Sequence, residues 1–262
     1  MSLIINQLSA GYNHHQVLKG INAEFQQGQV IVLIGPNGCG KSTLLKCIAQ
    51  IHPYDQGQVI WEKNQLNLLS KKLLAKQLAL LPQHVTAPNG MTVEQLVRFG
   101  RFPHQGWFKR LNIEDQKAID DALSATHLSD LKNQNLSNLS GGQRQRAWIA
   151  MVLAQQTPLI LLDEPISMLD IGHQADILNL VRSLASQGKT IVMVLHELAT
   201  AARCADFLVA MKDGQIIAQG KSEDVLTKQL VHQLYNLDAE VRIVEDDQSK
   251  KRLLVIPNKF GD

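Results

Sequence analysis

Hydrophobic residues follow two patterns in the first part of the chain. Apolar side chains alternate with polar ones at Ile21, Ala23 and Phe25, which is typical of a half-buried antiparallel strand. Beyond Gly28 the pattern changes to an unbroken apolar run over residues 30–34. A run in which every position is apolar predicts a parallel strand buried on both faces.

A helix is predicted directly after this run. Apolar residues recur there at helical spacing until Pro53 ends the pattern: Leu44, Leu45, Ile48 and Ile51. Two further apolar runs, at 159–162 and 191–195, are separated by a helical pattern over about residues 174–186. Strands that alternate with helices in this way predict an α/β fold with a parallel sheet.

The middle and the end of the chain are organised differently. Residues from about 88 to 155 carry helical periodicities and no convincing strand, so we expect an inserted, mostly α-helical subdomain. Residues 241–245 and 253–256 predict a small C-terminal β-hairpin over 241–257. The main domain is expected over 2–240.

Composition narrows the classes of function. The chain has 262 residues, with 26 Lys and Arg against 24 Asp and Glu, so non-specific capture of DNA or of an anionic membrane is not expected as its main activity. No apolar run approaches the ~20 residues that span a bilayer, and the N-terminus lacks an export signal. The three cysteines have neither metal-ligand spacing nor the density of a disulfide framework. We therefore expect a cytoplasmic protein with reduced thiols.

A phosphate-binding loop is the first chemical motif. Residues 35–43 fit the pattern G-x-x-x-x-G-K-[ST] between a buried strand and a helix. Glycines let consecutive backbone N–H groups point at phosphate oxygens, and the helix directs its positive end at the same place. Lys41 is expected to reach the β and γ phosphates, and the Ser42 hydroxyl to bind Mg²⁺. The predicted loop residues are Gly35, Pro36, Asn37, Gly38, Cys39, Gly40, Lys41, Ser42 and Thr43.

A pair of carboxylates ends the strand predicted at 159–162. Asp163 and Glu164 follow it, at the sheet edge where α/β proteins bind ligands. Asp163 can hold Mg²⁺ through water, and Glu164 can polarise the water that attacks the γ-phosphorus. An acidic strand end is weak evidence alone, but next to a phosphate loop it becomes strong.

A second glycine-rich helix start is the most diagnostic segment. Ser140 can cap a helix, and the glycines behind it expose N–H groups, yet one chain needs only one cradle for a γ-phosphate. Together the three motifs resemble the ATP-binding subunit of an ABC transporter. The resemblance implies the P-loop NTPase fold of the ABC ATPases, with an N-terminal antiparallel β subdomain, and hydrolysis of ATP with Mg²⁺. It also implies a homodimer in which one copy closes on the ATP of the other through Ser140, Gly141, Gly142 and Gln143.

The resemblance implies roles for further residues. Tyr12 corresponds to the ring that stacks on adenine, and Gln83 to the glutamine that contacts Mg²⁺ and the attacking water. Asp170 matches the loop that crosses the dimer, and His196 the histidine that touches the γ-phosphate. The expected catalytic residues are therefore Glu164, His196 and Gln83, and the expected metal ligands are Ser42, Gln83 and Asp163.

Three positions add detail to this picture. Ile166 stands where the family commonly has Thr, and Glu197 where it often has Asp; neither change removes a catalytic group. Cys39 lies at a helix N-terminus, where the pKa of a thiol tends to fall. We expect its alkylation to block ATP hydrolysis and ATP to protect it.

The resemblance narrows to a subfamily. Segments at 100–108, 143–151, 169–174 and 241–257 resemble those of ferric siderophore importers. This implies uptake of ferric siderophore or another iron chelate, powered from the cytoplasmic face of the inner membrane by a peripheral subunit. The implied partners are two integral membrane permease subunits and, indirectly, a periplasmic or lipoprotein substrate-binding protein, without nucleic acid. Import of haem or corrinoid, or a DNA- or ribosome-associated ABC ATPase, are the alternatives.

The permease is expected to dock on residues 91–108, within the helical subdomain. The apolar side chains of this segment fit a docking surface, but they fit a core equally well. These side chains are Phe102, Trp107 and Phe108.

Overall fold

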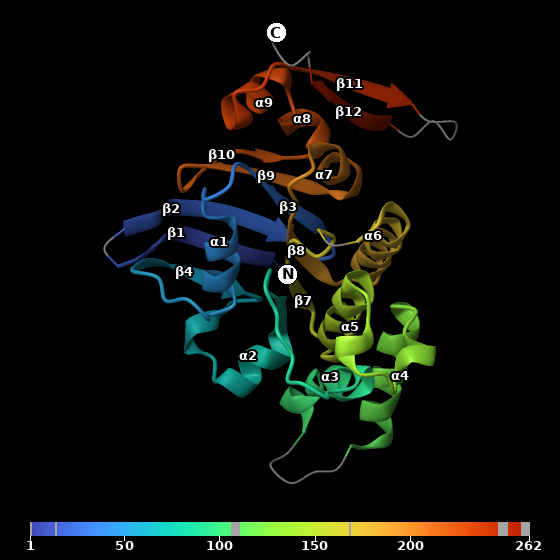
Figure 1. Cartoon of the computed structure of the whole chain (residues 1–262). Coiled ribbons are helices and arrows are strands. Elements are labelled where there is room, and N and C mark those ends of the chain that lie inside the picture. Colours follow the sequence, from blue (N-terminus) through green and yellow to red (C-terminus); the bar gives the residue numbers. More distant parts are fainter. Residues whose placement is uncertain (1, 14, 106–110, 168, 246–250, 258–262) are drawn as a thin grey trace.

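The computed structural model describes residues 2–13, 15–105, 111–167, 169–245 and 251–257. At its centre is a six-stranded sheet in the order β10-β9-β3-β8-β7-β6 (Figure 1). All neighbours in it are parallel except β9 and β10. The strands are β3 (Val30–Ile34), β6 (Leu78–Leu81), β7 (Leu159–Asp163), β8 (Thr190–Val194), β9 (Phe207–Lys212) and β10 (Gln215–Gly220). Every residue of β3, β7 and β8 is buried, so the apolar runs are confirmed as central parallel strands.

A second, antiparallel sheet covers one side of α1 (Lys41–Ile48). It consists of β1 (Ser2–Tyr12), β2 (His15–Gln26), β4 (Gln56–Trp61) and β5 (Asn64–Gln65). Ile21, Ala23 and Phe25 are buried, as their alternation predicts. They share one core with residues of α1 and of β3, so the strand before the loop and the helix after it are both held from this side.

The first helix is shorter than its apolar pattern predicts. It ends at Ile48, and Gln50 adopts a left-handed φ of 57°. Ile51 therefore lies beyond the helix and is 67% exposed. The prediction that the helical pattern runs to Pro53 is wrong at this end, because one left-handed residue turns the chain before the proline is reached.

The opposite face of the central sheet carries the later helices and a C-terminal hairpin (Figure 1). Buried side chains from the sheet, the helices and Ala239 of the hairpin form one core. These elements are α6 (Ile171–Ser186), α7 (Leu198–Cys204), α8 (Ser222–Val225), α9 (Lys228–Tyr235), β11 (Ala239–Glu245) and β12 (Lys251–Pro257). The expected α/β fold class is confirmed.

A helical lobe lies below the sheets in Figure 1. It has its own core, built by α3 (Val93–Phe99), α4 (Ile113–Ala125) and α5 (Gly141–Ala154). Helix α2 (Lys71–Gln77) lies just before β6. Within the described residues, no helix is both long enough and apolar enough to span a membrane.

A buried ion pair fastens the turn after α3 to the rest of this lobe. Arg101 is 4% exposed and Asp115 is 3% exposed, and Arg101 Nε lies 2.9 Å from Asp115 Oδ1. Arg101 Nη1 also donates to the carbonyl of Ala154, 2.7 Å away, and to Gln156 Oε1 at 2.9 Å. The cation is thus paired and hydrogen-bonded, which a buried charge requires.

Candidate functional site

The phosphate loop curls between β3 and α1. At two of its positions the backbone conformation and the close neighbours favour glycine over any residue with a Cβ. Gly35 has a φ of 145°, and a Cβ there would lie 2.1 Å from the carbonyl oxygen of Met211. Gly40 has a φ of 106°, and its Cβ would lie 2.8 Å from Leu18. Gly38, at the exposed tip of the loop, has a φ of 79° with open space around it. The glycines therefore serve backbone conformation and close packing, as the motif predicts.

Lys41 is folded back into the loop that precedes it. Its side chain is buried, and Nζ donates to the carbonyl oxygens of Gly35 at 2.7 Å and of Pro36 at 3.0 Å. Thr43 is buried, whereas Asn37 is exposed at the tip. The carbonyls compensate for removing the ammonium group from water, and they hold the charge inside the curl where an anion is expected.

Ser42 and Asp163 meet beside the loop. The Ser42 hydroxyl donates to Asp163 Oδ1 across 3.0 Å. Burial raises the pKa of the Asp163 carboxyl, and the nearby Glu164 charge adds to this, although the Ser42 hydrogen bond works against it. A hydroxyl and a carboxylate are hard oxygen donors, and this pairing is the type that binds Mg²⁺ beside a nucleotide. The residues present therefore fit the ion that the motif implies.

Two side chains from separate strand ends converge on one oxygen of a third, Glu164. Glu164 follows β7 with a φ of 54°, an uncommon conformation for a residue with a Cβ. Its Oε1 accepts a hydrogen bond from Gln83 Nε2 at 2.8 Å. His196 Nε2 lies 2.5 Å from the same oxygen. The sequence places these residues after β6, β7 and β8, and the sheet edge brings them together.

The second glycine-rich segment begins α5. Ser140 Oγ accepts from Gln143 N at 3.2 Å, and Gln143 Oε1 accepts from Ser140 N at 2.9 Å, so the two residues form a capping box. Gly141 has an ordinary φ, and a Cβ there would meet nothing within 4 Å. Gly142 follows it in the first turn of the helix. Neither space nor backbone geometry within the described chain explains why position 141 is glycine.

Two other predicted residues make contacts within the chain. Asp170 caps α6, because its Oδ1 accepts from His173 N at 2.9 Å and its Oδ2 lies 2.8 Å from His173 Nδ1. Tyr12 is 42% exposed and stacks on His52, with ring centroids 4.1 Å apart. One face of the Tyr12 ring is thus supported by a second ring.

Comparison with known families identifies the chain from these motifs. The family described as ABC transporter matches residues 18–167, which include the phosphate loop, Ser140 and Glu164. The chain belongs to the ABC transporter family. The cassettes of this family are ATPases coupled to transport, and the chain is an ATPase of that kind.

Relatives of this cassette match it over almost their whole length. The iron(3+)-hydroxamate import ATP-binding protein FhuC of Bacillus subtilis is 44% identical over 95% of the chain and 93% of the relative. The ferric enterobactin transport ATP-binding protein FepC of Escherichia coli is 41% identical over 96% of the chain and 92% of the relative.

Solved ABC structures share the fold. An inward-facing metal-chelate type ABC transporter is similar with a TM-score of 0.85 and 27% identity, over 98% of both chains. The dimeric post-hydrolysis structure of the cassette MJ0796, bound to ADP and Pi, has a TM-score of 0.75 and 26% identity over 84% of this chain and 98% of that one. The expected architecture of an ABC ATPase is therefore confirmed.

Two contacts of this cassette were not predicted. The hydroxyl of Tyr235, in α9, accepts a hydrogen bond from Gly35 N at 3.1 Å. Gln145, in α5, donates to the carbonyl of Pro165 at 3.1 Å, next to Glu164. Tyr235 lies outside every predicted motif, and Gln145 lies in the segment 143–151 but had no predicted role. Both contacts join segments that only the tertiary fold brings together.

The expectation that the pKa of the Cys39 thiol falls is wrong. Its side chain is 4% exposed, and burial raises the pKa of the thiol above its ordinary value although the Lys41 charge lowers it. Loss of hydration outweighs the neighbouring cation, so this thiol is less readily ionised than a free one.

The two departures from the family pattern are accommodated locally. Ile166 is 6% exposed and belongs to the main core, where its side chain packs. Glu197 Oε2 accepts a hydrogen bond from Thr200 Oγ1, so it stabilises the start of α7.

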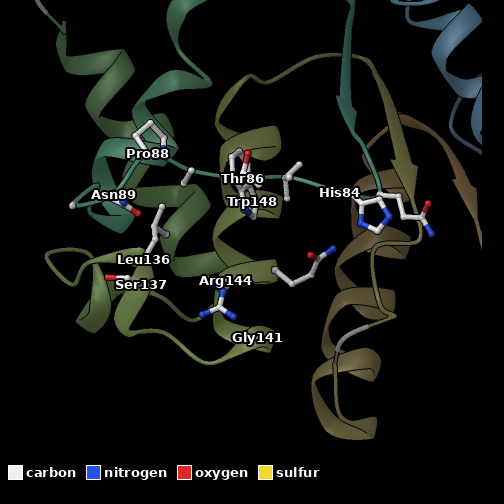
Figure 2. A pocket seen from close by; sticks show the side chains of 14 residues that line it. His84, Thr86, Pro88, Asn89, Leu136, Ser137, Gly141, Arg144 and Trp148 are labelled. Atoms are coloured by element: carbon white, nitrogen blue, oxygen red, sulfur yellow. The ribbon is translucent and has the colours of Figure 1, made fainter.

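A cleft of about 480 Å³ opens between the segment after β6 and the start of α5. Figure 2 shows His84 at one side of it, and Leu136 and Ser137 at the other. Gln83 lies in the wall of this cleft, so the same residue borders the cleft and contacts Glu164.

Exposed aromatic rings lie farther along this lobe. Phe99 is 40% exposed and Phe102 is 58% exposed, with ring centroids 4.8 Å apart. The core interpretation of Phe102 is therefore wrong. Trp107 and Phe108 lie outside the described residues.

Proposed function

We propose that the chain is the ATP-hydrolysing subunit of an importer that takes up ferric siderophores or related iron chelates across the cytoplasmic membrane. The convergence of Gln83 and His196 on Glu164, beside a phosphate loop, is the observation that carries the ATPase role. The cargo class rests on the relatives named for iron(3+)-hydroxamate and ferric enterobactin.

ATP binds at the phosphate loop. The part of the loop after Pro36 supplies backbone N–H groups to the phosphates, and Lys41 exchanges its carbonyl partners for phosphate oxygens. Ser42, Asp163 and Gln83 would hold Mg²⁺, and the ion would neutralise charge that develops on the phosphates. Tyr12, supported by His52, stacks on the adenine.

Hydrolysis depends on Glu164. Its carboxylate accepts the proton of the attacking water, and Gln83 and His196 orient the groups around it. In the structure both partners contact Glu164 Oε1, so a water between Glu164 and the γ-phosphate would replace or share these hydrogen bonds. His196 is positioned by the end of β8, where it can also contact a γ-phosphate oxygen.

Two copies act together. No contact within the described chain requires glycine at position 141, because a Cβ there would meet open space. The glycine is explained if the phosphates of ATP in a partner cassette approach the helix start closely. Ser140, Gly142 and Gln143 then contact the same ATP, and Asp170 lies in the loop that crosses the interface. The dimeric cassette structure supports this arrangement.

The dimer converts ATP binding into movement. ATP favours the closed form only by the difference between its affinities for the closed and open forms. Closure brings the two helical lobes together and moves whatever is docked on them, and hydrolysis allows the dimer to reopen. The main domain, 2–240, provides this machinery, and 241–257 is a small extension.

The permease docks on the helical lobe. Two features support this location: the cleft beside Gln83, and the exposed rings of Phe99 and Phe102. Exposed aromatic rings on a lobe that also borders a cleft suit a helix from a membrane subunit. The cassette then lies at the cytoplasmic face of the membrane, and a binding protein on the other side contacts the permease only.

Uptake in cells tests the proposal. In a host from which the gene is deleted, wild-type protein should restore uptake of ⁵⁵Fe bound to a hydroxamate or a catecholate, and Glu164→Gln should not. Uptake of haemin is measured in the same strains, because haem is the alternative cargo. Restoration of haemin uptake alone, or of no uptake at all, would contradict the ferric siderophore assignment.

A further inference from the structure

The last helix of the main domain contacts the first residue of the phosphate loop. Tyr235 is the last residue of α9, and its hydroxyl oxygen accepts a hydrogen bond from Gly35 N at 3.1 Å. The residues lie 200 positions apart. Gly35 belongs to the phosphate loop, but the ATPase mechanism assigns no role to Tyr235.

Tyr235 is held firmly in place. Leu230, Val231 and Leu234 of the same helix are buried in the main core. The end of α9 is fixed by Asn236, which has a left-handed φ of 52°. Lys212 Nζ also donates to the carbonyl oxygen of Gln233 at 2.5 Å, which joins the helix to the end of β9.

Gly35 is the residue whose conformation needs such support. It has a φ of 145°, which glycine adopts readily, and no side chain restrains it. Its carbonyl accepts from Lys41 Nζ, a contact that the ammonium group gives up when it turns to phosphate. The hydrogen bond to Tyr235 then remains to hold the start of the loop.

We propose that Tyr235 is a positioning residue that pre-organises the phosphate loop, so that nucleotide affinity depends on how α9 and the C-terminal hairpin are seated. Val241 and Val255 of the hairpin pack against the same core as Tyr235. A disturbance of the hairpin is therefore transmitted to the loop through one helix and one hydrogen bond. This inference rests on the proposed ATP site.

The Tyr235 hydroxyl stays in one protonation state. Burial raises the pKa of Tyr235 to about 12, although the Gly35 hydrogen bond lowers it. The hydroxyl therefore stays neutral over the working range of pH, and its effect on the loop does not vary with pH.

A single-atom substitution tests the proposal, and the chain supplies its control. Tyr235→Phe removes the acceptor of Gly35 N. Tyr54→Phe removes a hydroxyl that is also buried but has no hydrogen-bond partner among the described residues. Each variant is compared with wild type in affinity for a fluorescent ATP analogue, in KM and kcat for ATP, in urea unfolding, and in amide exchange of the loop.

We expect Tyr235→Phe to weaken nucleotide affinity and raise KM about three- to tenfold, because a net hydrogen bond of ordinary strength is lost from the pre-organised loop. We expect kcat to stay within about twofold, since Glu164 and its partners are untouched. Amides of the loop should exchange faster, and Tyr54→Phe should behave as wild type in all but urea unfolding.

The inference is overturned if Tyr235→Phe keeps wild-type nucleotide affinity and loop exchange, or if Tyr54→Phe loses as much affinity as Tyr235→Phe. Loss of urea stability without any change in affinity also overturns it, since that is what a purely structural hydroxyl would give. If wild-type protein itself fails to bind Mg-ATP, the proposed function fails instead, so the two failures are distinguishable.

Discussion

Gln83 and Glu164 are joined by a hydrogen bond of 2.8 Å although 81 positions separate them in the chain. Gln83 also lies in the wall of the cleft between the sheet domain and the helical lobe. A change in the position of the lobe therefore reaches the carboxylate through one side chain. Gln83 thus links the proposed permease surface to the proposed catalytic base.

Replacing Glu164 should separate ATP binding from hydrolysis. We expect Glu164→Gln to lower kcat by at least about a hundredfold, since it removes the proton acceptor. Affinity for Mg-ATP should be retained, because Lys41 and the loop are unchanged. Phosphate release and binding of a fluorescent ATP analogue are the measurements.

The matched control is Glu24→Gln, which changes an exposed glutamate in β2. It should hydrolyse ATP at the wild-type rate. Normal turnover in Glu164→Gln would remove Glu164 from the role of base.

The motifs of this site could be predicted from sequence because each combines local signals. The phosphate loop is contiguous, and Gln83, Glu164 and His196 each follow an apolar strand. Parallel strands end at one edge of a sheet, so residues at such ends lie together. Local pattern and strand order were sufficient for the phosphate loop and Glu164, whereas Gln83 and His196 were expected only from the resemblance to the ABC family.

Other features depend on packing that a local pattern does not contain. The contact between Tyr235 and Gly35 requires the end of α9 to lie beside the phosphate loop that follows β3. The burial of Cys39 depends on how tightly the loop is covered, and this decides the direction of its pKa shift. The early end of α1 is set by one left-handed residue, Gln50. No glycine or proline in the sequence at this point indicates that the helix ends there.

The ion pair between Arg101 and Asp115 should matter strongly for stability. We expect Arg101→Ala to reduce the free energy of unfolding by about 3–5 kcal/mol, because it leaves a buried carboxylate unpaired. Urea unfolding measures this, with the exposed Arg98→Ala as the control. Equal stability of the two variants would show that the buried pair contributes nothing.

The same pair predicts a dependence on pH. Burial raises the pKa of Asp115, but hydrogen bonds from Arg101 and Asn112 more than offset this and hold it below its ordinary value. The stabilisation is therefore fully present above the pKa of about 3.9 that Asp has in the unfolded chain, and is lost as pH falls through the lower folded value. The stability advantage over Asp115→Asn should be constant from about pH 5 to pH 8 and shrink below about pH 4. An advantage that grows on acidification would contradict this sign.

Thiol reactivity should be low in the folded protein. All three cysteines are buried, and desolvation raises the pKa of Cys47 and Cys204 to about 12. At about pH 8 we expect a thiol reagent to modify the native protein about a hundredfold more slowly than the urea-unfolded protein. Once Cys39 is modified, turnover should cease, and ATP should slow that modification. Rapid labelling of Cys39 in the native protein would contradict its burial.

The association of two cassettes around ATP is the central claim, and sedimentation of Glu164→Gln tests it most directly. With saturating Mg-ATP we predict a dimer, and without nucleotide a monomer. Adding Gly141→Asp, which the open space around position 141 admits without a clash inside the chain, should leave ATP binding intact and keep the protein monomeric. The account would be contradicted if Glu164→Gln with ATP bound stayed monomeric both free in solution and assembled with its permease. It would also be contradicted if the double variant Glu164→Gln, Gly141→Asp dimerised as readily as Glu164→Gln alone.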